Sequence, residues 1–442
     1  MDSYNHYLIA KNTWKHPNLF LDQWGKPVYN IIASPFVQFG INGATVLNIL
    51  CLVLSSLLAY KCAQRMNLRY SFLAYVLTLI SPIFLDNTLS SLTEPLCALL
   101  VVWTIYLSIS NQFVSASILA GILPFARSEG FIVLFAVALY IVIIKRQYKY
   151  IFFLTAGSVF FNTLGWIIEG DPFWIFTQNP YINFQLSGRN VCGNGGIGHY
   201  YYALPYTFGT FTSLLVGIAA FFFMFKVLTH KSLKGQSEYA LILLSAGLYF
   251  LAHVFIWWLG MMGSCGYIRV MTVISPLIAV LATVGLHHLF KLIPGYKLLK
   301  TILVSSLILY SIWVPYRFYA YKYPLKISAE QEQYEKLLKW YEQQEFENRT
   351  KIYLYPYFSI IADIDPYDQT QHLYSWPNSR EFSKVGDILI WDSHFGPHES
   401  GTPLDKLLLN DNWQRIHSII PNKKIPTVND APFQIHVFEK IK

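Results

Sequence analysis

The feature that most constrains this chain is a series of long apolar runs between residues 31 and 318, where charged side chains are sparse. A helix of about 20 apolar residues is long enough to cross the hydrocarbon core of a bilayer. The whole chain is 13% charged, whereas soluble domains average about 25%. The sequence therefore predicts an integral membrane protein.

The apolar runs predict about ten transmembrane helices, because runs shorter than a full span are tolerated when other helices bury them. The expected helices lie at 42–60, 71–85, 91–109, 113–125, 129–145, 150–168, 207–227, 238–258, 269–290 and 299–317. Lys and Arg gather in alternate loops, at 61–69, 145–149, 226–234 and 291–300. The positive-inside rule assigns these loops to the cytoplasm. The outer segments are then 1–41, the turns at 86–87 and around Arg127, the loop 169–206, the turn 259–268 and the tail from 318.

This topology divides the chain into three parts. Residues 1–41 form the first outer loop, 42–318 the transmembrane helical domain and 319–442 a soluble, extracytoplasmic C-terminal domain. The predicted fold is thus an all-α polytopic membrane protein with a C-terminal α/β domain. Because residues 1–41 must be outside although no upstream span carries them across, we expect the natural chain or its homologues to begin with one more helix.

The α/β character of the C-terminal domain follows from its local patterns. The polar stretch 329–347 is typical of a helix. The runs KIYLY (351–355), DILIW (387–391) and FQIHVF (433–438) are typical of strands, and turn-forming residues lie between them.

The net charge of +8 does not indicate a nucleic-acid partner. Most Lys and Arg of the membrane part lie in short loops, where they act as topology signals. The soluble tail shows no basic stripe with interleaved aromatic residues. We therefore expect a membrane environment and no nucleic acid.

Ionisable side chains at membrane depth are costly, so those that persist usually face a pocket or a pathway. Glu94, Arg127, Glu129 and Arg269 all fall at the outer ends of expected spans. They are level with loops that contain Asp2, Lys26, Asp171 and Arg189. A transporter would place such groups near the midplane, often at broken helices. The pattern favours chemistry at the outer leaflet.

The first loop begins with a carboxylate, Asp2, and an imidazole, His6, in an amphipathic stretch whose aromatic residues suit the membrane interface. Such a loop can hold a general base above the bilayer. The alternative is that Asp2 is a solvated carboxylate at a chain end.

Several short motifs occur in a characteristic order. They are WGKPVY at 24–29 after the acidic start of the first loop, TEP at 93–95, ARSEG at 126–130 and GDPFWIFTQNPY at 170–181. In this order the chain resembles the polytopic glycosyltransferases of the GT-C class. It looks like bacterial membrane glycosyltransferases and mannosyltransferases of the family that includes the lipid A aminoarabinose transferase and the protein O-mannosyltransferases. The resemblance covers roughly residues 1–317.

The resemblance implies that a sugar moves from a polyprenyl-phosphate donor to a lipid, glycan or protein acceptor, with inversion by general-base catalysis. It places this reaction at the outer face of a bacterial cytoplasmic membrane. The first-loop acidic residue is the presumed base in that family, and Asp2 matches it. The family usually has a second acidic residue next, where this chain has Ser3. No cofactor or metal site is therefore expected, although a divalent ion stays an open alternative.

The remaining site residues follow from the chemistry of the leaving group. A lipid phosphate gains negative charge in the transition state, so cations must stabilise it. Lys26, Arg127 and Arg269 suit this role, since a planar guanidinium can bind two phosphate oxygens. The alternative is that Arg127 pairs with Glu94 or Glu129 and stabilises packing.

Other polar residues are assigned less specific roles. Glu94 and Glu129 would shape the site together with Asp171, which either positions the sugar or caps a turn. His6 and Arg189 are expected to contact substrate, and Arg189 lies in a Gly-, Asn- and Tyr-rich stretch that reads as a mobile loop.

Two further patterns leave alternatives open. Cys192 and Cys265 both fall outside on this topology, where they either form a disulfide or stay free thiols. The segment DSHFGPHE at 392–399 has carboxylate and imidazole groups at spacings that suit a metal. No second cluster accompanies it, so a polar loop is the expectation.

Three rival functions remain at this stage. A transporter or flippase for a lipid-linked sugar predicts deeper charges and pseudo-symmetric halves. A polysaccharide polymerase would also fit the long outer loop at 169–206. A non-enzymatic membrane scaffold is disfavoured by the clustering of ionisable residues at one end of the spans.

Overall fold

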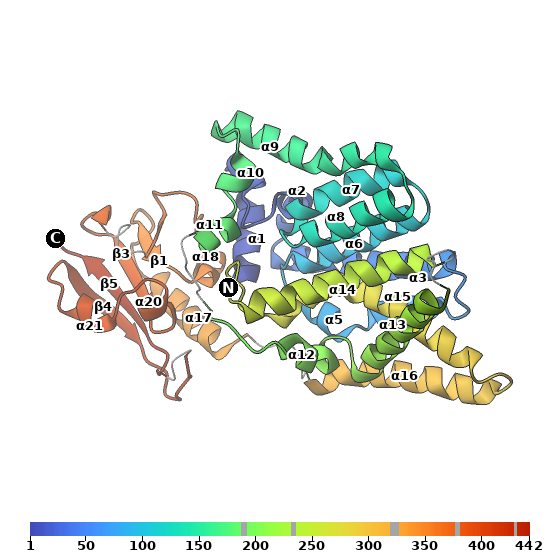
Figure 1. Ribbon diagram of the computed structural model, residues 1–442. Helices are drawn as coiled ribbons and strands as arrows, with labels where there is room; N and C mark the ends of the chain where they lie inside the picture. The colour runs from blue at the N-terminus through green and yellow to red at the C-terminus, as the bar shows by residue number, and fades with distance from the viewer. Residues whose placement is uncertain (187–191, 231–235, 319–326, 376–380, 428–430) are drawn as a thin grey trace. The chain divides into compact units, whose positions relative to one another are not determined.

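The computed structural model describes residues 1–186, 192–230, 236–318, 327–375, 381–427 and 431–442 (Figure 1). The chain divides into two compact units, and each is described here by itself. The helical unit comprises Ile9–Thr13 and Pro17–Tyr321. The sheet unit comprises Met1–Leu8, Trp14–His16 and Lys322–Lys442.

Within the described residues, the helical unit has six helices that are long and apolar enough to cross a membrane. They are α3 (Ile41–Arg65), η3 with α9 (Tyr148–Thr155 and Ala156–Glu169), α13 (Thr210–His230), α14 (Ser237–Trp258), η4 with α15 (Ile268–Ile274 and Ser275–Lys291) and α16 (Lys297–Phe318). Each corresponds to one expected span. The chain is therefore a helical membrane protein by length and composition of its helices.

Ten full spans are not confirmed, because the other apolar helices are shorter. They are α2 (Pro27–Val37), α6 (Glu94–Ile109), α7 (Phe113–Ala126) and α8 with η2 (Gly130–Leu139 and Tyr140–Ile144). A helix of 16 residues such as α6 is about 24 Å long, below the roughly 30 Å of a hydrocarbon core. Helix α2 was expected to be part of a loop.

The span expected at 71–85 is two short helices, α4 (Phe72–Leu79) and α5 (Pro82–Thr88). Proline lacks an N–H and disfavours helical backbone at the residue before it. Ser81 accordingly has an extended ψ of 122°. The apolar run thus continues through a break that Pro82 imposes.

The remaining helices are short. They are α1 (Asp2–Asn12), which both units share, η1 (Pro17–Leu21), α10 (Trp174–Thr177), α11 (Pro180–Leu186) and α12 (His199–Thr207).

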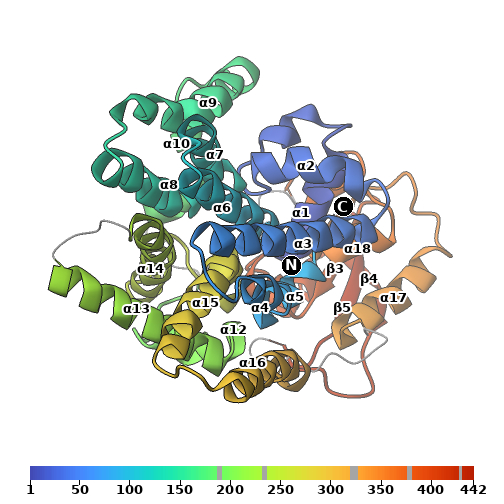
Figure 2. The same ribbon diagram turned by 90° about the vertical axis from the view of Figure 1, so that its right-hand side faces the viewer.

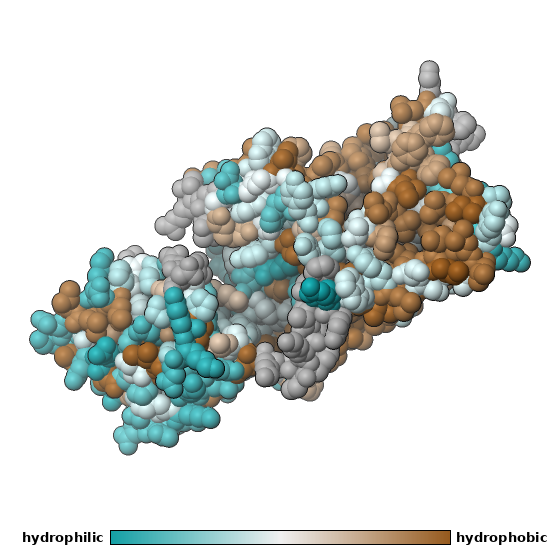
Figure 3. All heavy atoms as spheres, turned by 90° about the horizontal axis from the view of Figure 1, so that it is seen from below, coloured by the Kyte–Doolittle hydropathy of each residue, from teal (hydrophilic) through white to brown (hydrophobic). Residues whose placement is uncertain are grey.

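Helix α15 lies inside the helical bundle and packs against α13, α3, α4 and α14 (Figures 1 and 2). Gly285 permits a close approach of α15 to α13, since a Cβ atom there would meet the carbonyl oxygen of Leu215 at 2.0 Å. Other helices expose apolar side chains, as at Ile167 (73%) of α9 and Leu228 (71%) of α13. Hydrophobic side chains gather over this part of the molecule (Figure 3). Such a surface suits contact with lipid.

The sheet unit contains one five-stranded mixed sheet in the order β2-β1-β3-β5-β4. The strands are β1 (Lys351–Tyr353), β2 (His372–Tyr374), β3 (Ile388–Asp392), β4 (Trp413–Ile419) and β5 (Ile435–Lys440). Strand β1 is parallel to β2 and β3, whereas β5 is antiparallel to β3 and β4. The helices are α17 (Ala329–Tyr341), α18 (Pro356–Ile361), α20 (Phe395–His398) and α21 (Leu404–Leu408).

Three strands and one helix of this unit were predicted from the sequence. Strands β1, β3 and β5 overlap the runs at 351–355, 387–391 and 433–438. Helix α17 begins at a capping box in which Ser328 and Gln331 exchange hydrogen bonds. Strands β2 and β4 were not predicted, since one is three residues long and the other carries several polar side chains.

Candidate functional site

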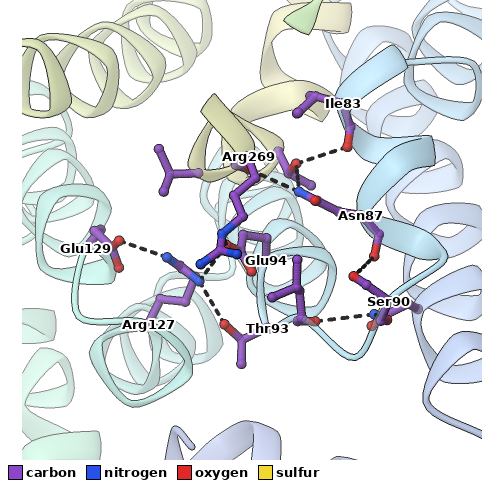
Figure 4. A network of polar contacts seen from close by, with 12 residues as sticks. Ile83, Asn87, Ser90, Thr93, Glu94, Arg127, Glu129 and Arg269 are labelled. Carbon is purple, nitrogen blue, oxygen red and sulfur yellow. Dashed lines mark hydrogen bonds and ion pairs between the residues drawn. The ribbon is translucent and has the colours of Figure 1, made fainter. Parts of the chain in front are cut away.

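Four ionisable side chains meet where apolar helices of the helical unit begin or end (Figure 4). We call Glu94, Arg127, Glu129 and Arg269 the charged cluster. Glu94 is the first residue of α6, Arg127 directly follows α7, Glu129 directly precedes α8, and Arg269 is the second residue of η4. Helix ends thus bring together residues up to 175 positions apart in the sequence, from Glu94 to Arg269.

Arg127 is bound on both sides by carboxylates. Its Nη1 lies 3.0 Å from Oε1 of Glu94, and its Nη2 donates to Oε1 of Glu129 at 2.9 Å. The Nη1 also donates to Oγ1 of Thr93 at 2.8 Å. Arg127 thus pairs with both Glu94 and Glu129, the contacts that the packing alternative expected.

Arg269 shares the same carboxylate but is more accessible. Its Nε lies 3.3 Å from Oε1 of Glu94, and its guanidinium lies 4.6 Å from the ring centroid of Tyr267. The exposed fractions of the side chains are 27% for Arg269, 9% for Arg127 and zero for Glu94. Arg269 is therefore the cation of the cluster that a ligand can reach most easily.

The electrostatics of the cluster stabilise its charged forms. Burial alone would raise the pKa of Glu129, but the attraction of Arg127 outweighs it and lowers the pKa to about 2. Burial opposes the charge of Arg127, yet Glu129 and Glu94 hold its pKa well above the usual value. Oε2 of Glu94 has no hydrogen-bond donor among the described residues. One buried carboxylate oxygen therefore keeps its accepting capacity.

Polar side chains from neighbouring helices hold the backbone around the cluster. Asn48 of α3 donates to the carbonyl of Ser90 at 2.6 Å, and the hydroxyls of Tyr29 and Ser91 lie 2.7 Å apart. These contacts fix the segment that leads into Glu94. Asn87 donates to the carbonyl of Arg269 at 3.1 Å and thereby fixes η4.

Lys26 lies at the start of α2 in a left-handed conformation, with φ of 69°. Its ammonium donates to the carbonyl of Gln23 at 2.7 Å and lies 4.6 Å from the ring centroid of Tyr181. The residue is 3% exposed. Burial lowers the pKa of Lys26 to about 8, while the charges of Glu129 and Asp22 oppose this shift and that of Arg127 adds to it.

An open pocket adjoins Lys26, and we call it the Lys26 pocket. Its polar lining is Gln23, Lys26, Ser128 and Asn179, and its apolar lining is Pro27, Pro124, Phe125, Phe131 and Ile175. The enclosed part of the pocket is small, with a cavity volume of about 20 Å³. A buried cation beside an apolar wall is suited to an anionic group that carries a hydrocarbon chain.

The other predicted site residues lie elsewhere. Asp2 and His6 belong to the sheet unit, where Asp2 is the first residue of α1 and His6 is buried. Asp171 accepts hydrogen bonds from the backbone of Phe173 at 2.8 Å and from the hydroxyl of Thr177. Asp171 therefore caps the turn into α10. Arg189 lies outside the described residues.

Cys192 and Cys265 form a disulfide, which decides between the two alternatives for these residues. The bond joins the segment before α12 to the turn that leads into η4 and Arg269. His199 supports the same junction, with its Nε2 2.7 Å from the carbonyl oxygen of Gly266. The other three cysteines are buried free thiols.

The segment at 392–399 has internal partners in the sheet unit. Asp392 accepts from the hydroxyl of Tyr334 at 2.7 Å and from the backbone of His394 at 2.9 Å. His394 in turn lies 3.0 Å from a carboxylate oxygen of Glu330. Among the described residues no group of three or more His, Cys, Asp or Glu side chains is arranged to hold a metal ion.

Several residues that organise the site were not predicted from the sequence. Asp22 accepts the backbone N–H of Gly25 at 2.5 Å and thus shapes the turn that presents Lys26. An Asp three residues before a Gly is a recognisable turn signal. Asn87 and Thr93 gave no comparable signal, because their partners are distant in the sequence or depend on side-chain geometry.

The chain matches no known protein family, no curated protein and no solved structure.

Proposed function

We propose that this protein is a membrane glycosyltransferase that moves a sugar from a polyprenyl-phosphate donor to an acceptor at the outer face of the membrane. The observation that carries the proposal is that the charged cluster and the Lys26 pocket lie at the same ends of the apolar helices. Buried cations and an apolar wall lie together where apolar helices begin and end. This combination suits a phosphate group attached to a long hydrocarbon chain.

The cations of the site have different roles in this proposal. Lys26 and Arg269 bind the phosphate, because Lys26 lines the pocket and Arg269 is the more exposed guanidinium of the charged cluster. Arg127 instead holds Glu94 and Glu129 in place through its two ion pairs. Glu94 orients Arg269 through the oxygen that it shares between both guanidinium groups.

The proposed reaction is a displacement at the anomeric carbon of the sugar. An acceptor hydroxyl or amine forms a bond to this carbon as the bond to the phosphate oxygen breaks. The electron pair leaves with the phosphate, where the cations stabilise the growing negative charge. The acceptor proton passes to a carboxylate, a role that the resemblance assigns to Asp2.

The test is transfer of radiolabelled sugar from a panel of polyprenyl-phosphate donors in proteoliposomes. The variants are Asp2→Asn, Lys26→Gln and Arg269→Gln at equal protein level. Loss of a transition-state cation typically lowers kcat by about 10²–10³-fold. Lys145→Gln is the matched control. Lys145 pairs with Glu238, and neither residue belongs to the charged cluster or lines the Lys26 pocket. This variant should keep wild-type activity.

Three results would contradict the proposal. Full activity in both Lys26→Gln and Arg269→Gln would remove the cations from the mechanism. Movement of a lipid-linked sugar across the bilayer without transfer from any donor would favour the flippase. Elongation of a lipid-linked glycan by whole repeats would favour the polymerase, which would use the same phosphate chemistry of the donor.

A further inference from the structure

A second hollow of the helical unit lies beside the Lys26 pocket, and we call it the Trp24 pocket. Its lining comes from η1, the turn that presents Lys26, the end of α9 and the segment of α10 and α11. Gln23 lines both pockets. The cavity volume of the Trp24 pocket is about 230 Å³, a little below the roughly 300 Å³ at which drug-sized small-molecule sites begin.

The walls of the Trp24 pocket are held by direct contacts. Gln23 donates to the carbonyl of Trp174 at 3.0 Å. The ring of Trp174 packs on Gly165, where a Cβ atom would lie 2.2 Å from it. Trp24 stacks on Tyr181 with ring centroids 6.3 Å apart. The hollow is therefore part of the folded unit and not a gap between loosely packed loops.

The chemistry of the lining differs from that of the Lys26 pocket. The side chains of Asp22 and Glu169 are carboxylates, and Asn18, Gln23 and Gln178 add amide groups. No Lys or Arg of the described residues lines the hollow. Two carboxylates without a cation repel an anion, so this pocket does not suit the phosphate.

The same groups suit a neutral ligand with many hydroxyl groups. Carboxylates accept hydrogen bonds from hydroxyls, and amides both donate and accept them. The flat indole of Trp24 offers an apolar face to C–H groups. A sugar ring presents both kinds of surface at once, with hydroxyls at its rim and C–H groups on its faces.

We propose that the Trp24 pocket binds the sugar ring of the lipid-linked donor. This inference rests on the proposed function, because it is the donor that requires two adjoining subsites. The sugar is bonded directly to the phosphate, so its pocket must border the phosphate pocket. Gln23 forms that border, and Lys26 lies three residues beyond it in the chain.

Two readouts on the purified full chain test this assignment. The first is the binding of methyl glycosides of common hexoses and pentoses, which saturation-transfer NMR detects with the protein in micelles. The second is the KM for the lipid-linked donor in the transfer assay. Trp24→Ala and Glu169→Gln should each weaken glycoside binding and raise KM by about tenfold or more.

Trp166→Ala is the matched control. Trp166 lies on α9 near Glu169 but is 58% exposed and lines neither pocket. It should keep both glycoside binding and KM. Glu169 is itself exposed, so Glu169→Gln keeps the test valid where Trp24→Ala disturbs folding.

The outcomes separate this inference from the proposed function. Unchanged KM in both pocket variants, with transfer intact, would overturn the sugar assignment and leave the transferase standing. Glycoside binding that depends on Trp24, in a protein that transfers no sugar, would support the sugar pocket and contradict the proposed transferase activity. Absence of glycoside binding together with unchanged KM would overturn the pocket outright.

Discussion

At the residue scale, Glu94 is the centre of the charged cluster because one of its oxygens serves two guanidinium groups. Removing its charge would leave Arg127 and Arg269 without their common partner in a buried site. Loss of one partner of a buried ion pair typically costs about 3–5 kcal/mol. We therefore expect Glu94→Gln to lower the thermal midpoint of the protein in detergent by several degrees and to reduce transfer activity.

The control for this substitution is Glu238→Gln. Glu238 pairs with Lys145 at 3.2 Å, but both side chains are partly exposed, at 32% and 22%. Such pairs contribute about 0–1 kcal/mol, so the thermal midpoint should scarcely move. Equal effects of the two substitutions would mean that burial of the cluster is not what gives Glu94 its importance.

The lowered pKa of Lys26 predicts opposite effects of pH on the stability of the protein and on donor binding. Burial lowers its pKa to about 8, whereas an unfolded lysine titrates near its usual 10.5. Between these values the unfolded chain binds more protons, so stability rises with pH. Donor binding needs the charged ammonium and should therefore fall as pH rises through about 8.

The measurement is the thermal midpoint and the donor KM from pH 6.5 to 10 for wild type and Lys26→Arg. A guanidinium keeps its charge across this range. The variant should lose the rise in KM above pH 8 while retaining measurable transfer. A wild-type KM that stays constant over the whole range would remove Lys26 from the phosphate site.

At the element scale, close helix packing depends on glycines. Helices α7 and α9 meet at Gly121 and Gly157, where a Cβ atom on Gly157 would lie 2.0 Å from the carbonyl oxygen of Gly121. Small residues let helix backbones approach closely in membranes. Gly157→Ala should therefore destabilise the protein by about 1–3 kcal/mol, the usual cost of overpacking, as measured by thermal unfolding in detergent.

Gly247→Ala on α14 provides the contrast, since nothing lies within 4 Å of a Cβ atom built there. Alanine is favoured over glycine within helices by about 0.5–1 kcal/mol. The thermal midpoint should therefore stay unchanged or rise. A loss of stability equal to that of Gly157→Ala would show that the contact between α7 and α9 is not the cause.

The element pattern was predictable where one signal dominated. Six long apolar runs became six long helices, because their length leaves little choice in a bilayer. The run at 71–85 was misjudged because apolar composition outweighed the break at Pro82. Strand β4 was missed because an antiparallel edge strand alternates polar and apolar residues weakly, as at Gln414 and Arg415.

At the scale of the whole molecule, topology alone anticipated much of the site. Alternation of the spans put Glu94, Arg127, Glu129 and Arg269 at one level, and the structure brings these four together. Which of them pair was not predictable, because the pairing depends on how the helices pack. Asp2 belongs to the sheet unit, so its role as base stays a prediction that the transfer assay tests.

The sidedness of the membrane part is the last prediction, and single cysteines can test it. With the basic loops at 61–69 and 145–149 in the cytoplasm, the alternation of the expected spans assigns the loop at 110–112 to the cytoplasm and the loop at 169–206 to the outside. Gln112 and Ile197 are both exposed in the helical unit. In intact cells, an impermeant maleimide should label Ile197→Cys, and it should label Gln112→Cys only after the membrane is opened.

The native cysteines give this experiment a low background. Cys51, Cys62 and Cys97 are buried, and Cys192 is bonded to Cys265. The unmodified chain should therefore stay unlabelled, and labelling of it would show that the disulfide is open in cells. A reversed pattern, with Gln112→Cys labelled from outside, would place the charged cluster on the cytoplasmic side. The donor would then have to be used at the inner leaflet, because the cluster and the Lys26 pocket lie at the same helix ends.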